Sequence, residues 1–260
     1  MGKELQGKRA IITGAARGIG AGLARGLASA GVGLTLVDRL DDVGGIASEL
    51  GATAHQGDVA DASFVRSVVD DCAAAGPIDV LINNAGEVWP TGPRDTWQAA
   101  IDDYDRLIGS NLRGAFLFGR AVIPAMVEGG SGHIINVSSD HIKPAPETGW
   151  HHGHGAMDLY NAAKWALNGL TFDWAVALGR HGIRVNNVCM GATDTKMLRD
   201  WIGVDPEPEQ LATWMTPEGI ADVVVDLLCE GPNGRTGDNI GLWAGYDTVL
   251  PPVNEGRPVS

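Results

Sequence analysis

Basic residues are scarce in this 260-residue sequence: 19 lysines and arginines stand against 32 aspartates and glutamates, a formal net charge of −13. A nucleic-acid-binding surface requires a basic patch or stripe, and an anionic lipid surface repels a chain of this charge. We therefore expect neither nucleic acid nor a membrane surface among the partners of the protein.

Cysteine is also rare. The three residues, Cys72, Cys189 and Cys229, are odd in number and lack C-x-x-C spacing, which argues against a disulfide framework and against a cysteine zinc site. No apolar run approaches the length of a membrane span, and the first residues lack the apolar stretch of a signal peptide. We therefore expect reduced thiols and a cytoplasmic location.

Tyrosine and phenylalanine are scarce, at three and four residues, whereas tryptophan numbers eight. The composition is otherwise that of a globular protein, with 44% hydrophobic and 20% charged residues. A chain of this length can bury a sizeable core. The excess of tryptophan is the unusual feature.

Short apolar runs alternate with longer helical patterns, without an internal repeat, a low-complexity tract or a linker. The expected strands are Ala10–Thr13, Leu34–Val37, Thr53–His55, Val80–Asn83, His133–Val137, Arg184–Val188 and Asn239–Leu242. The expected helices lie near Gly18–Ala30, Asp41–Leu50, Ser63–Ala75, Asp103–Val127, Leu159–Gly179 and Pro217–Leu228. The strand runs are apolar on both faces, as buried parallel strands are. The pattern predicts an α/β fold whose parallel sheet is covered by helices on both sides.

The first expected strand runs into a glycine-rich turn, Thr13-Gly14-Ala15-Ala16-Arg17-Gly18-Ile19-Gly20, and then into a helix. Such a turn offers free backbone N–H groups and a positive helix end to a pyrophosphate. Gly14 would permit the tight turn, Gly18 the approach of the phosphates, and Gly20 close packing of the helix. The alternative is a plain connection, because glycine-rich turns also serve that purpose. The context favours dinucleotide binding.

The second expected strand ends at Asp38, 18 positions after Gly20 and near the usual spacing for the acid that holds the adenosine ribose. A carboxylate there accepts hydrogen bonds from the ribose hydroxyls and repels a 2′-phosphate, which favours NAD over NADP. Arg17 and Arg39 point the other way, because arginines can pair with a 2′-phosphate. Asp38 could instead cap a helix.

Tyr160 and Lys164 are four positions apart at the start of an expected helix and therefore share one helix face. A tyrosine with a pKa of ~10 is a poor base at neutral pH. An ammonium ~5 Å away, at an effective dielectric constant of ~20, would stabilise the phenolate by roughly 3 kcal/mol. We therefore expect Lys164 to lower the pKa of Tyr160 by about two, towards the range of a proton shuttle. On its own the spacing is also common in surface pairs.

The sequence resembles the short-chain dehydrogenase/reductase family over nearly its whole length, from Leu5 to Ala244. The motifs that carry the resemblance occur in order: Thr13-Gly14-x-x-x-Gly18-x-Gly20, Asp58-Val59, Asn83-Asn84-Ala85-Gly86, Asn111, Ser139, Tyr160-x-x-x-Lys164 and Arg184-Val185-Asn186. The resemblance implies one Rossmann-like domain, a doubly wound parallel sheet of about seven strands in the order 3-2-1-4-5-6-7. We expect that domain to span residues 1–260.

The resemblance also implies hydride transfer between nicotinamide and a secondary alcohol or ketone. Tyr160 would be the general acid and base, and Lys164 would lower its pKa and bind the nicotinamide ribose. Ser139 would hold the substrate oxygen, and Asn111 would position a water in a proton relay. The other implied cofactor contacts are Arg17, Ile19, Asp58, Val59, Asn84, Ala85, Gly86, Thr193 and Thr195. The Asn83–Gly86 turn could also be purely structural, since asparagine and glycine close βα turns.

Two segments depart from the strand–helix rhythm. Residues 140–158 are expected to form a substrate loop and residues 190–216 a lid, since long loops in compact domains are usually functional. Met190-Gly191 stands where the family has Pro-Gly. Residues 247–260 form a C-terminal tail that could pack across a neighbouring subunit.

His151, His152 and His154 are close together, but no cysteine or carboxylate pair completes a ligand set, so we expect no metal.

Four tryptophans, Trp89, Trp150, Trp201 and Trp214, fall in segments expected to frame the cleft. They favour a cyclic, aromatic or hydrophobic substrate. A sugar or polyol is the alternative, because sugars also stack on tryptophan. The candidate pocket residues are Trp89, His141, Trp150, His151, Met190, Trp201 and Trp214. A protein that only senses NAD or acts as a scaffold would be a function of another class on the same fold. The family resemblance further implies a homo-oligomer, usually a tetramer.

Overall fold

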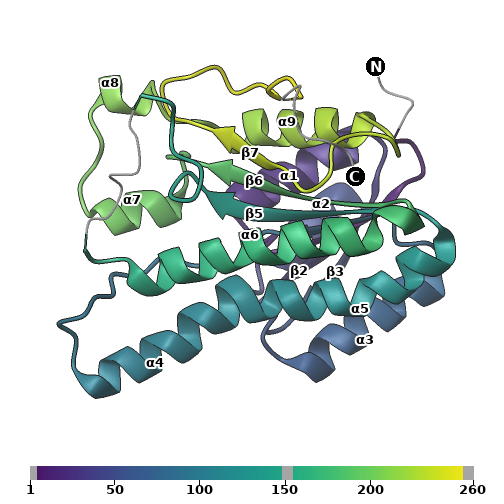
Figure 1. Ribbon diagram of the computed structural model, residues 1–260, viewed down its shortest axis with the longest axis horizontal. Coiled ribbons are helices and arrows are strands. Elements are labelled where there is room, and N and C mark those ends of the chain that lie inside the picture. Colours follow the sequence, from purple (N-terminus) through teal and green to yellow (C-terminus); the bar gives the residue numbers. More distant parts are fainter. Residues whose placement is uncertain (1–4, 148–154, 254–260) are drawn as a thin grey trace.

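The computed structural model describes residues 5–147 and 155–253. Within these residues seven parallel strands form one sheet in the order β3-β2-β1-β4-β5-β6-β7 (Figure 1). The strands are β1 Arg9–Thr13, β2 Gly33–Asp38, β3 Thr53–Gln56, β4 Val80–Asn83, β5 Gly132–Ser139, β6 Ile183–Met190 and β7 Asn239–Leu242. The α/β class, the parallel sheet and the strand order expected from the sequence are confirmed.

Helices cover both faces of the sheet. They are α1 Gly18–Ser29, α2 Val43–Leu50, α3 Ala62–Ala75, α4 Trp97–Ile108, α5 Gly114–Gly129, α6 Asp158–Leu178, α7 Lys196–Ile202, α8 Pro208–Leu211 and α9 Pro217–Cys229, with a π-helical turn η1 Gly109–Arg113 and a 3₁₀ turn η2 Gly179–His181. In Figure 1, α3, α5 and α6 lie below the sheet, and α1 and α9 lie above it.

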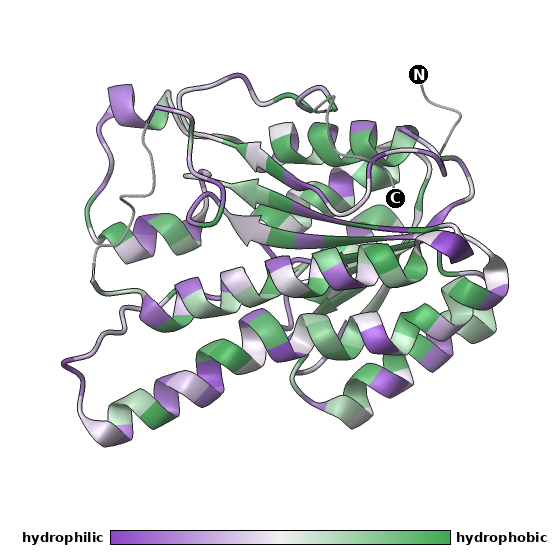
Figure 2. Ribbon diagram, in the orientation of Figure 1, coloured by the Kyte–Doolittle hydropathy of each residue, from purple (hydrophilic) through white to green (hydrophobic). Residues whose placement is uncertain are grey.

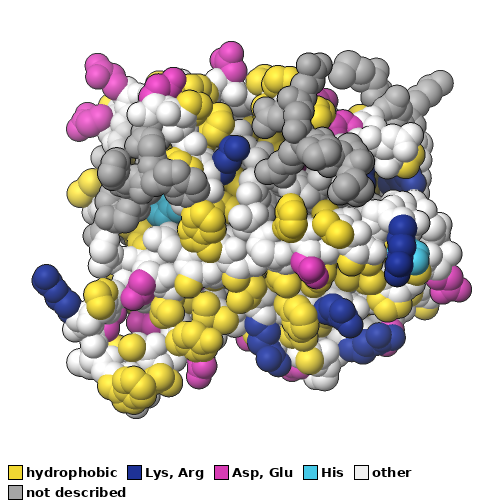
Figure 3. Space-filling model, in the orientation of Figure 1, with side chains coloured by type: hydrophobic (Ala, Val, Ile, Leu, Met, Phe, Trp, Pro, Cys, Tyr) yellow, Lys and Arg dark blue, Asp and Glu magenta, His cyan; other side chains and the backbone are white. Residues whose placement is uncertain are grey.

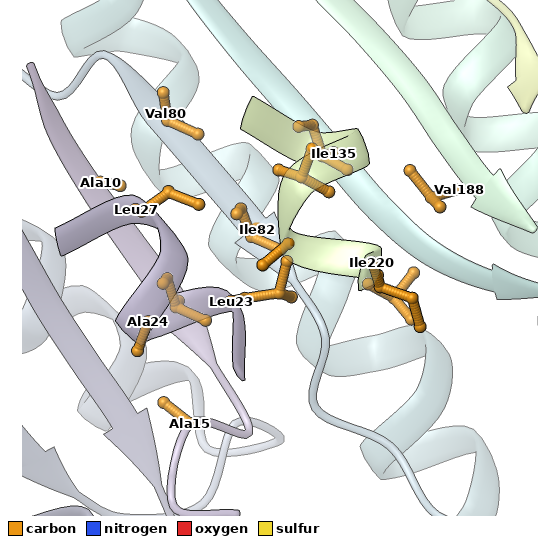
Figure 4. Packing of buried hydrophobic residues seen from close by; sticks show 14 of the residues in the cluster. Ala10, Ala15, Leu23, Ala24, Leu27, Val80, Ile82, Ile135, Val188 and Ile220 are labelled. Atoms are coloured by element: carbon orange, nitrogen blue, oxygen red, sulfur yellow. The ribbon is translucent and has the colours of Figure 1, made fainter. Parts of the chain in front are cut away.

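Alternation along the strands divides the core into two layers, because successive side chains of a strand point to opposite faces. Ile12 of β1 packs in the layer under α1, α2 and α9, whereas its neighbour Ile11 packs in the layer under α3, α5 and α6. Figure 4 shows part of the first layer, with Leu23 of α1, Ile82 of β4 and Ile220 of α9. Hydrophobic residues accordingly fill the strands, while the helices carry polar residues on their outer sides (Figure 2). This two-sided burial is why the strands could be read from continuous apolar runs.

The helix expected at Asp103–Val127 differs from the structure. It begins earlier, at Trp97, because the Thr96 hydroxyl accepts a hydrogen bond from the Ala99 N–H at 3.3 Å and caps the helix. It is also divided into α4 and α5 by the π-helical turn η1, which contains Asn111. The expected lid holds the short helices α7 and α8.

A chain of buried side-chain hydrogen bonds joins α6 to four neighbouring strands. It runs from Asn83 of β4 to Asn136 of β5, then to Thr171 of α6, Asn187 of β6 and Asn239 of β7, with donor–acceptor distances of 2.7–2.9 Å. Because Thr171 is 1% exposed, its hydroxyl fixes the rotation of α6 against the sheet. The helix that carries Tyr160 and Lys164 is therefore held in one orientation.

Within the described part of the chain, we find no helix with the length and apolar character needed to cross a membrane.

Candidate active site

The glycine-rich turn lies between the carboxyl end of β1 and the start of α1. Gly14 and Gly18 have φ values of +67° and +54°, which side chains rarely adopt. A Cβ atom on Gly20 would collide with the Gly14 carbonyl oxygen, and one on Gly14 would come within 2.8 Å of Ala85 Cα. The turn thus leaves a cradle of bare backbone at a helix N-terminus, which fits a pyrophosphate. Arg17 and Ile19 flank Gly18 at this helix start.

Residues after β4 lock this turn in place. Asn84 donates through Nδ2 to the carbonyl oxygens of Thr13 and Gly14 at 2.9 and 3.0 Å. The Thr13 hydroxyl accepts from the N–H groups of Asn84 and Ala85 at 3.1 and 3.0 Å. The Asn83–Gly86 turn therefore has a structural role. The Thr13 hydroxyl also helps to hold the glycine-rich turn, a role that the sequence pattern did not indicate.

Asp38 ends β2 and is 8% exposed. Its carboxylate accepts hydrogen bonds from the N–H groups of Ala16 and Leu40 at 2.9 and 3.0 Å. Each oxygen uses one lone pair in these bonds and keeps another for a further donor. The carboxylate is thus oriented beside the glycine-rich turn, where a ribose would bind.

Asp58 and Val59 lie between β3 and α3. The Asp58 side chain accepts from the Ala60 N–H at 2.8 Å, and Val59 is 7% exposed. A Cβ atom on Gly114 would come within 2.6 Å of Val59 Cγ2. These contacts hold the start of α3 against α5.

Ser139, Tyr160 and Lys164 meet at the carboxyl edge of the sheet. Ser139 ends β5, and the other two lie on the first turns of α6. Lys164 Nζ donates to the Val137 carbonyl oxygen at 2.9 Å and lies 5.5 Å from the centroid of the Tyr160 ring. Tyr160 and Ser139 share a hydrogen bond. The structure thus brings these three predicted residues together.

Burial controls the protonation of this pair. Although part of the Tyr160 side chain reaches the surface, burial of its hydroxyl raises the pKa to about 12, and the hydrogen bond with Ser139 only partly offsets this. Burial lowers the pKa of Lys164 to about 8. We expected the Lys164 ammonium to lower the Tyr160 pKa towards neutrality. For the free protein this expectation is wrong, because the loss of water around the phenol is the largest influence on its pKa, and the charge of Asp140 adds to it.

Asn111 lies in the π-helical turn and is 2% exposed. Its Nδ2 group donates to the carbonyl oxygens of Glu87 and Leu107 at 2.9 and 3.0 Å. Its Oδ1 atom is buried and has no hydrogen-bond partner among the described residues. A Cβ atom on Gly86 would lie 2.5 Å from that oxygen and 3.7 Å from Lys164 Nζ. An unpaired acceptor beside a lysine fits a bound water.

Glu87 is a buried carboxylate that the sequence analysis did not assign. It is 8% exposed, forms an ion pair with Arg106 and lies 3.5 Å from the Arg39 guanidinium. Arg106 also lies over the Trp89 ring, 4.7 Å from its centroid. The carboxylate of Glu87 thus links the end of β2 to α4, and Trp89 is held in place while 47% of it remains exposed.

The lid contacts the glycine-rich turn. Thr195 caps α7 by accepting from the Leu198 N–H at 3.3 Å, and its Cγ2 atom would lie 3.3 Å from a Cβ atom on Gly18. Thr193 is 4% exposed and pairs with Met215 in a β-bridge. These positions put the first part of the lid beside the proposed pyrophosphate cradle.

The candidate pocket residues differ in their neighbours and in their exposure to solvent. His141 is next to Tyr160, with ring centroids 5.8 Å apart, and its Nδ1 atom is 2.6 Å from Asn161 Oδ1. Trp201 is 40% exposed, whereas Met190 and Trp214 are 6% and 9% exposed. The low exposure of Trp214 makes it a packing residue of the lid in this conformation. Trp150, His151, His152 and His154 lie outside the described residues.

Among residues 5–147 and 155–253, no group of three or more histidines, cysteines or carboxylates could hold a metal ion.

Comparison with known proteins agrees with this arrangement. Residues 8–203 match the family described as short chain dehydrogenase. The 3-alpha-(or 20-beta)-hydroxysteroid dehydrogenase of Mycobacterium tuberculosis is 35% identical over 91% of this chain and 88% of its own. The oxidoreductase UcpA of Salmonella typhimurium is 34% identical over 92% of this chain and 85% of its own.

Solved structures give the same result. A mutant short-chain dehydrogenase/reductase of Serratia marcescens is 31% identical, with a TM-score of 0.79 over 93% of this chain and 98% of its own. A short-chain type dehydrogenase/reductase from Mycobacterium marinum is 30% identical, with a TM-score of 0.80 over 93% of this chain and 96% of its own. The chain belongs to the short-chain dehydrogenase/reductase family. It is an oxidoreductase of that family.

Proposed function

We propose that the protein transfers a hydride between NAD(H) and a secondary alcohol or ketone. The observation that carries this proposal is the meeting of Ser139, Tyr160 and Lys164 at the sheet edge that also holds the glycine-rich turn. The bare backbone cradle and the unpaired Asn111 oxygen both fit a bound nicotinamide dinucleotide and its water. A bound nicotinamide would donate or accept the hydride.

The side chains divide the remaining work. In ketone reduction, the Tyr160 phenol donates its proton to the substrate oxygen as that oxygen gains negative charge, and in alcohol oxidation it takes the proton back. Ser139 holds the same oxygen beside Tyr160. Lys164 and the water held by Asn111 Oδ1 would return the proton to Tyr160 from solvent. The raised pKa of Tyr160 keeps the phenol protonated in the free protein, as the reductive direction requires.

Two features support NAD over NADP. The Asp38 carboxylate is fixed by two backbone N–H groups where a 2′-phosphate would sit. Arg39 lies within ion-pair distance of Glu87, so its charge is partly used inside the protein. A relative in Mycobacterium tuberculosis, 32% identical, carries the name uncharacterized NAD-dependent oxidoreductase.

For the substrate we propose a cyclic, hydrophobic alcohol or ketone. Trp89, two residues after Glu87, leaves about half of its surface exposed. A relative is named as a hydroxysteroid dehydrogenase. A sugar or polyol is the second candidate, favoured by the polar residues around Tyr160. The hydrogen-bonded His141–Asn161 pair is the main such feature.

Self-association is a further part of the proposal. Large apolar side chains are exposed on α4, α5 and α6, where Figure 3 shows hydrophobic side chains gathered. They are Trp97 81%, Ile101 41%, Tyr104 51%, Phe116 43%, Trp165 45%, Phe172 61% and Val176 72% exposed. A patch of this kind on a soluble domain marks an interaction site, and we propose a homo-oligomer, with a tetramer favoured.

A cytoplasmic location fits the three cysteines, which form no disulfide.

The experiment is a turnover assay that follows NADH absorbance with NAD and, separately, NADP. The panel comprises hydroxysteroids, other cyclic alcohols, linear secondary alcohols, and sugars or polyols. Turnover of the cyclic members with NAD is expected, whereas preference for the sugars would favour the second candidate. Tight NAD binding without turnover of any member would instead favour a non-catalytic NAD sensor or scaffold.

A further inference from the structure

Asp140 directly follows Ser139 and lies beside the active site without an assigned role. Its backbone is fixed on both sides: its N–H donates to the Met190 carbonyl oxygen at 3.1 Å, and its carbonyl oxygen accepts from the Lys143 N–H at 3.1 Å. A Cβ atom on Gly191 would lie 2.8 Å from Asp140 Oδ2. The bare backbone of Gly191 therefore leaves the room that this carboxylate occupies.

The Ser139 hydroxyl is directed by its neighbours. It donates to Asp140 Oδ1 at 3.1 Å and accepts from the His141 N–H at 3.2 Å. A carboxylate can only accept and a serine has one proton to give, so this proton is committed to Asp140. With that proton committed, Ser139 can only accept from the Tyr160 hydroxyl, whereas a hydrogen bond donated by Ser139 to the phenolate is the one that would lower the Tyr160 pKa.

We propose that Asp140 is a positioning residue that competes with Tyr160 for the Ser139 proton and so holds Tyr160 as a protonated donor, poised for ketone reduction. This inference rests on the proposed function, because it explains why Tyr160 would act as the proton donor in that reaction. When Tyr160 ionises, the phenolate needs the Ser139 proton, and Asp140 must release it.

The charge of Asp140 opposes the hydrogen bond with Ser139, which lowers the pKa of Tyr160. Burial is the largest cause of the raised Tyr160 pKa, and the charge of Asp140 adds to it. The other groups facing Tyr160 are Lys164 on α6, the His141 ring and Cys189 on β6. Burial raises the pKa of Cys189 to about 12, so it remains a neutral thiol. Asp140 is therefore the anion that opposes the phenolate.

The test compares Asp140→Asn, which removes the charge, with Asp140→Ala, which also removes the acceptor. The matched control is Asp173→Asn, which removes one charge from an exposed position of α6. The first readout is the pH midpoint of kcat for alcohol oxidation, which requires the phenolate. Both Asp140 variants should move this midpoint to lower pH by on the order of one pH unit. At pH values below the midpoints of parent and variant, oxidation should then be about tenfold faster in the variant. The control should not move it.

The second readout does not depend on turnover. The chain has only three tyrosines, so the ultraviolet difference between a protein and its Tyr160→Phe form isolates the ionisation of Tyr160. This ionisation should occur at lower pH in Asp140→Asn and Asp140→Ala. If one variant fails to fold, the other gives the same readout.

The two proposals fail differently. If no panel substrate is turned over but the Tyr160 ionisation moves, the proposed function is wrong and the role of Asp140 stands. If the parent is active but neither Asp140 variant moves either midpoint, the role of Asp140 is wrong. A purely structural effect would lower the rate at every pH and leave both midpoints in place.

Discussion

At the scale of single residues, burial decides what the active-site groups do. Tyr160 and Lys164 have the spacing of a helical pair, and charge attraction alone would lower the pKa of Tyr160 and raise that of Lys164. Burial instead raises the pKa of Tyr160 to about 12 and lowers that of Lys164 to about 8. The free protein therefore keeps the Tyr160 phenol protonated, while Lys164 still carries its proton below a pH of about 8.

We propose that Asp38 gives the protein a preference for NAD over NADP. Asp38→Ala should weaken NAD far more than NADP, because it removes the acceptor for the ribose hydroxyls and the charge that repels a 2′-phosphate. The kcat/KM ratio for NAD over NADP should fall by about tenfold or more, the size of one charge-assisted hydrogen bond. Asp70→Asn, which changes an exposed carboxylate on α3, is the control. An unchanged ratio in Asp38→Ala would refute the specificity argument.

His133 makes stability depend on pH. It is 3% exposed, and burial, together with the nearby charge of Arg184, lowers its pKa well below 6.5. The folded protein keeps this imidazole neutral, whereas the unfolded chain takes up a proton as pH falls below about 6.5. Its contribution to stability is therefore complete above about pH 6.5 and declines in acid.

Urea unfolding at pH 7.5 and pH 5.5 measures this effect. His133→Gln, which stays neutral at both values, should lose less stability on acidification than the parent, by up to about 1.4 kcal/mol per pH unit. His181→Gln, at a more exposed histidine, should behave as the parent does. Equal losses in the parent and His133→Gln would show that His133 does not titrate in this range.

At the scale of secondary-structure elements, the orientation of α6 is the critical feature. Thr171→Val keeps the shape but removes the hydroxyl that joins Asn136 and Asn187. Two buried amide groups then lack a partner, at a cost of about 2–4 kcal/mol in the free energy of unfolding. Thr171→Ser, which keeps the hydroxyl, should lose clearly less. Urea unfolding of both variants checks this, and a Val variant as stable as the Ser variant would mean that the hydrogen-bond chain does not hold α6.

Much of the fold was predictable because the sheet is buried on both faces and each strand reads as an apolar run. The glycine-rich turn and the Tyr160–Lys164 pair were also readable, since both depend on local spacing. The division of α4 from α5 was not, because the π-helical turn has no periodic signal of its own. The roles of Glu87 and Asp140 were not readable either. Each depends on partners that only the folded chain brings close, and the same holds for the pKa of Tyr160.

At the scale of the whole molecule, the exposed apolar faces of α4 and α6 form the surface that we propose for self-association. These helices pack against each other, and Trp97, Ile101 and Tyr104 recur at helical spacing on α4. Light scattering should show the parent as an oligomer. The double variant Trp97→Glu with Phe172→Glu should shift it towards monomer, because two charges would be buried in the interface.

The control for this prediction is Val204→Glu, which places a charge on an exposed apolar residue of the lid. It should leave the parent assembly intact. A monomeric parent would reject self-association altogether, and an oligomer that persists in the double variant would locate the interface elsewhere.

The described tryptophans lie in different environments and serve different purposes. Trp174 is buried against α5, and Trp214 is buried in the lid, so both serve packing. Trp97 belongs to the surface proposed for self-association. Trp89 and Trp201 remain exposed, at 47% and 40%, and are the described tryptophans that we propose as substrate contacts.

The most direct test of the account is the turnover of Tyr160→Phe, measured with NAD and the best alcohol of the panel. We predict a loss of kcat of about a thousandfold or more, because the phenol is the acid and base of the proposed reaction. NAD binding, measured separately by fluorescence, should stay within about threefold of the parent, since the aromatic ring and Lys164 remain. A Tyr160→Phe enzyme with the kcat of the parent would contradict the account.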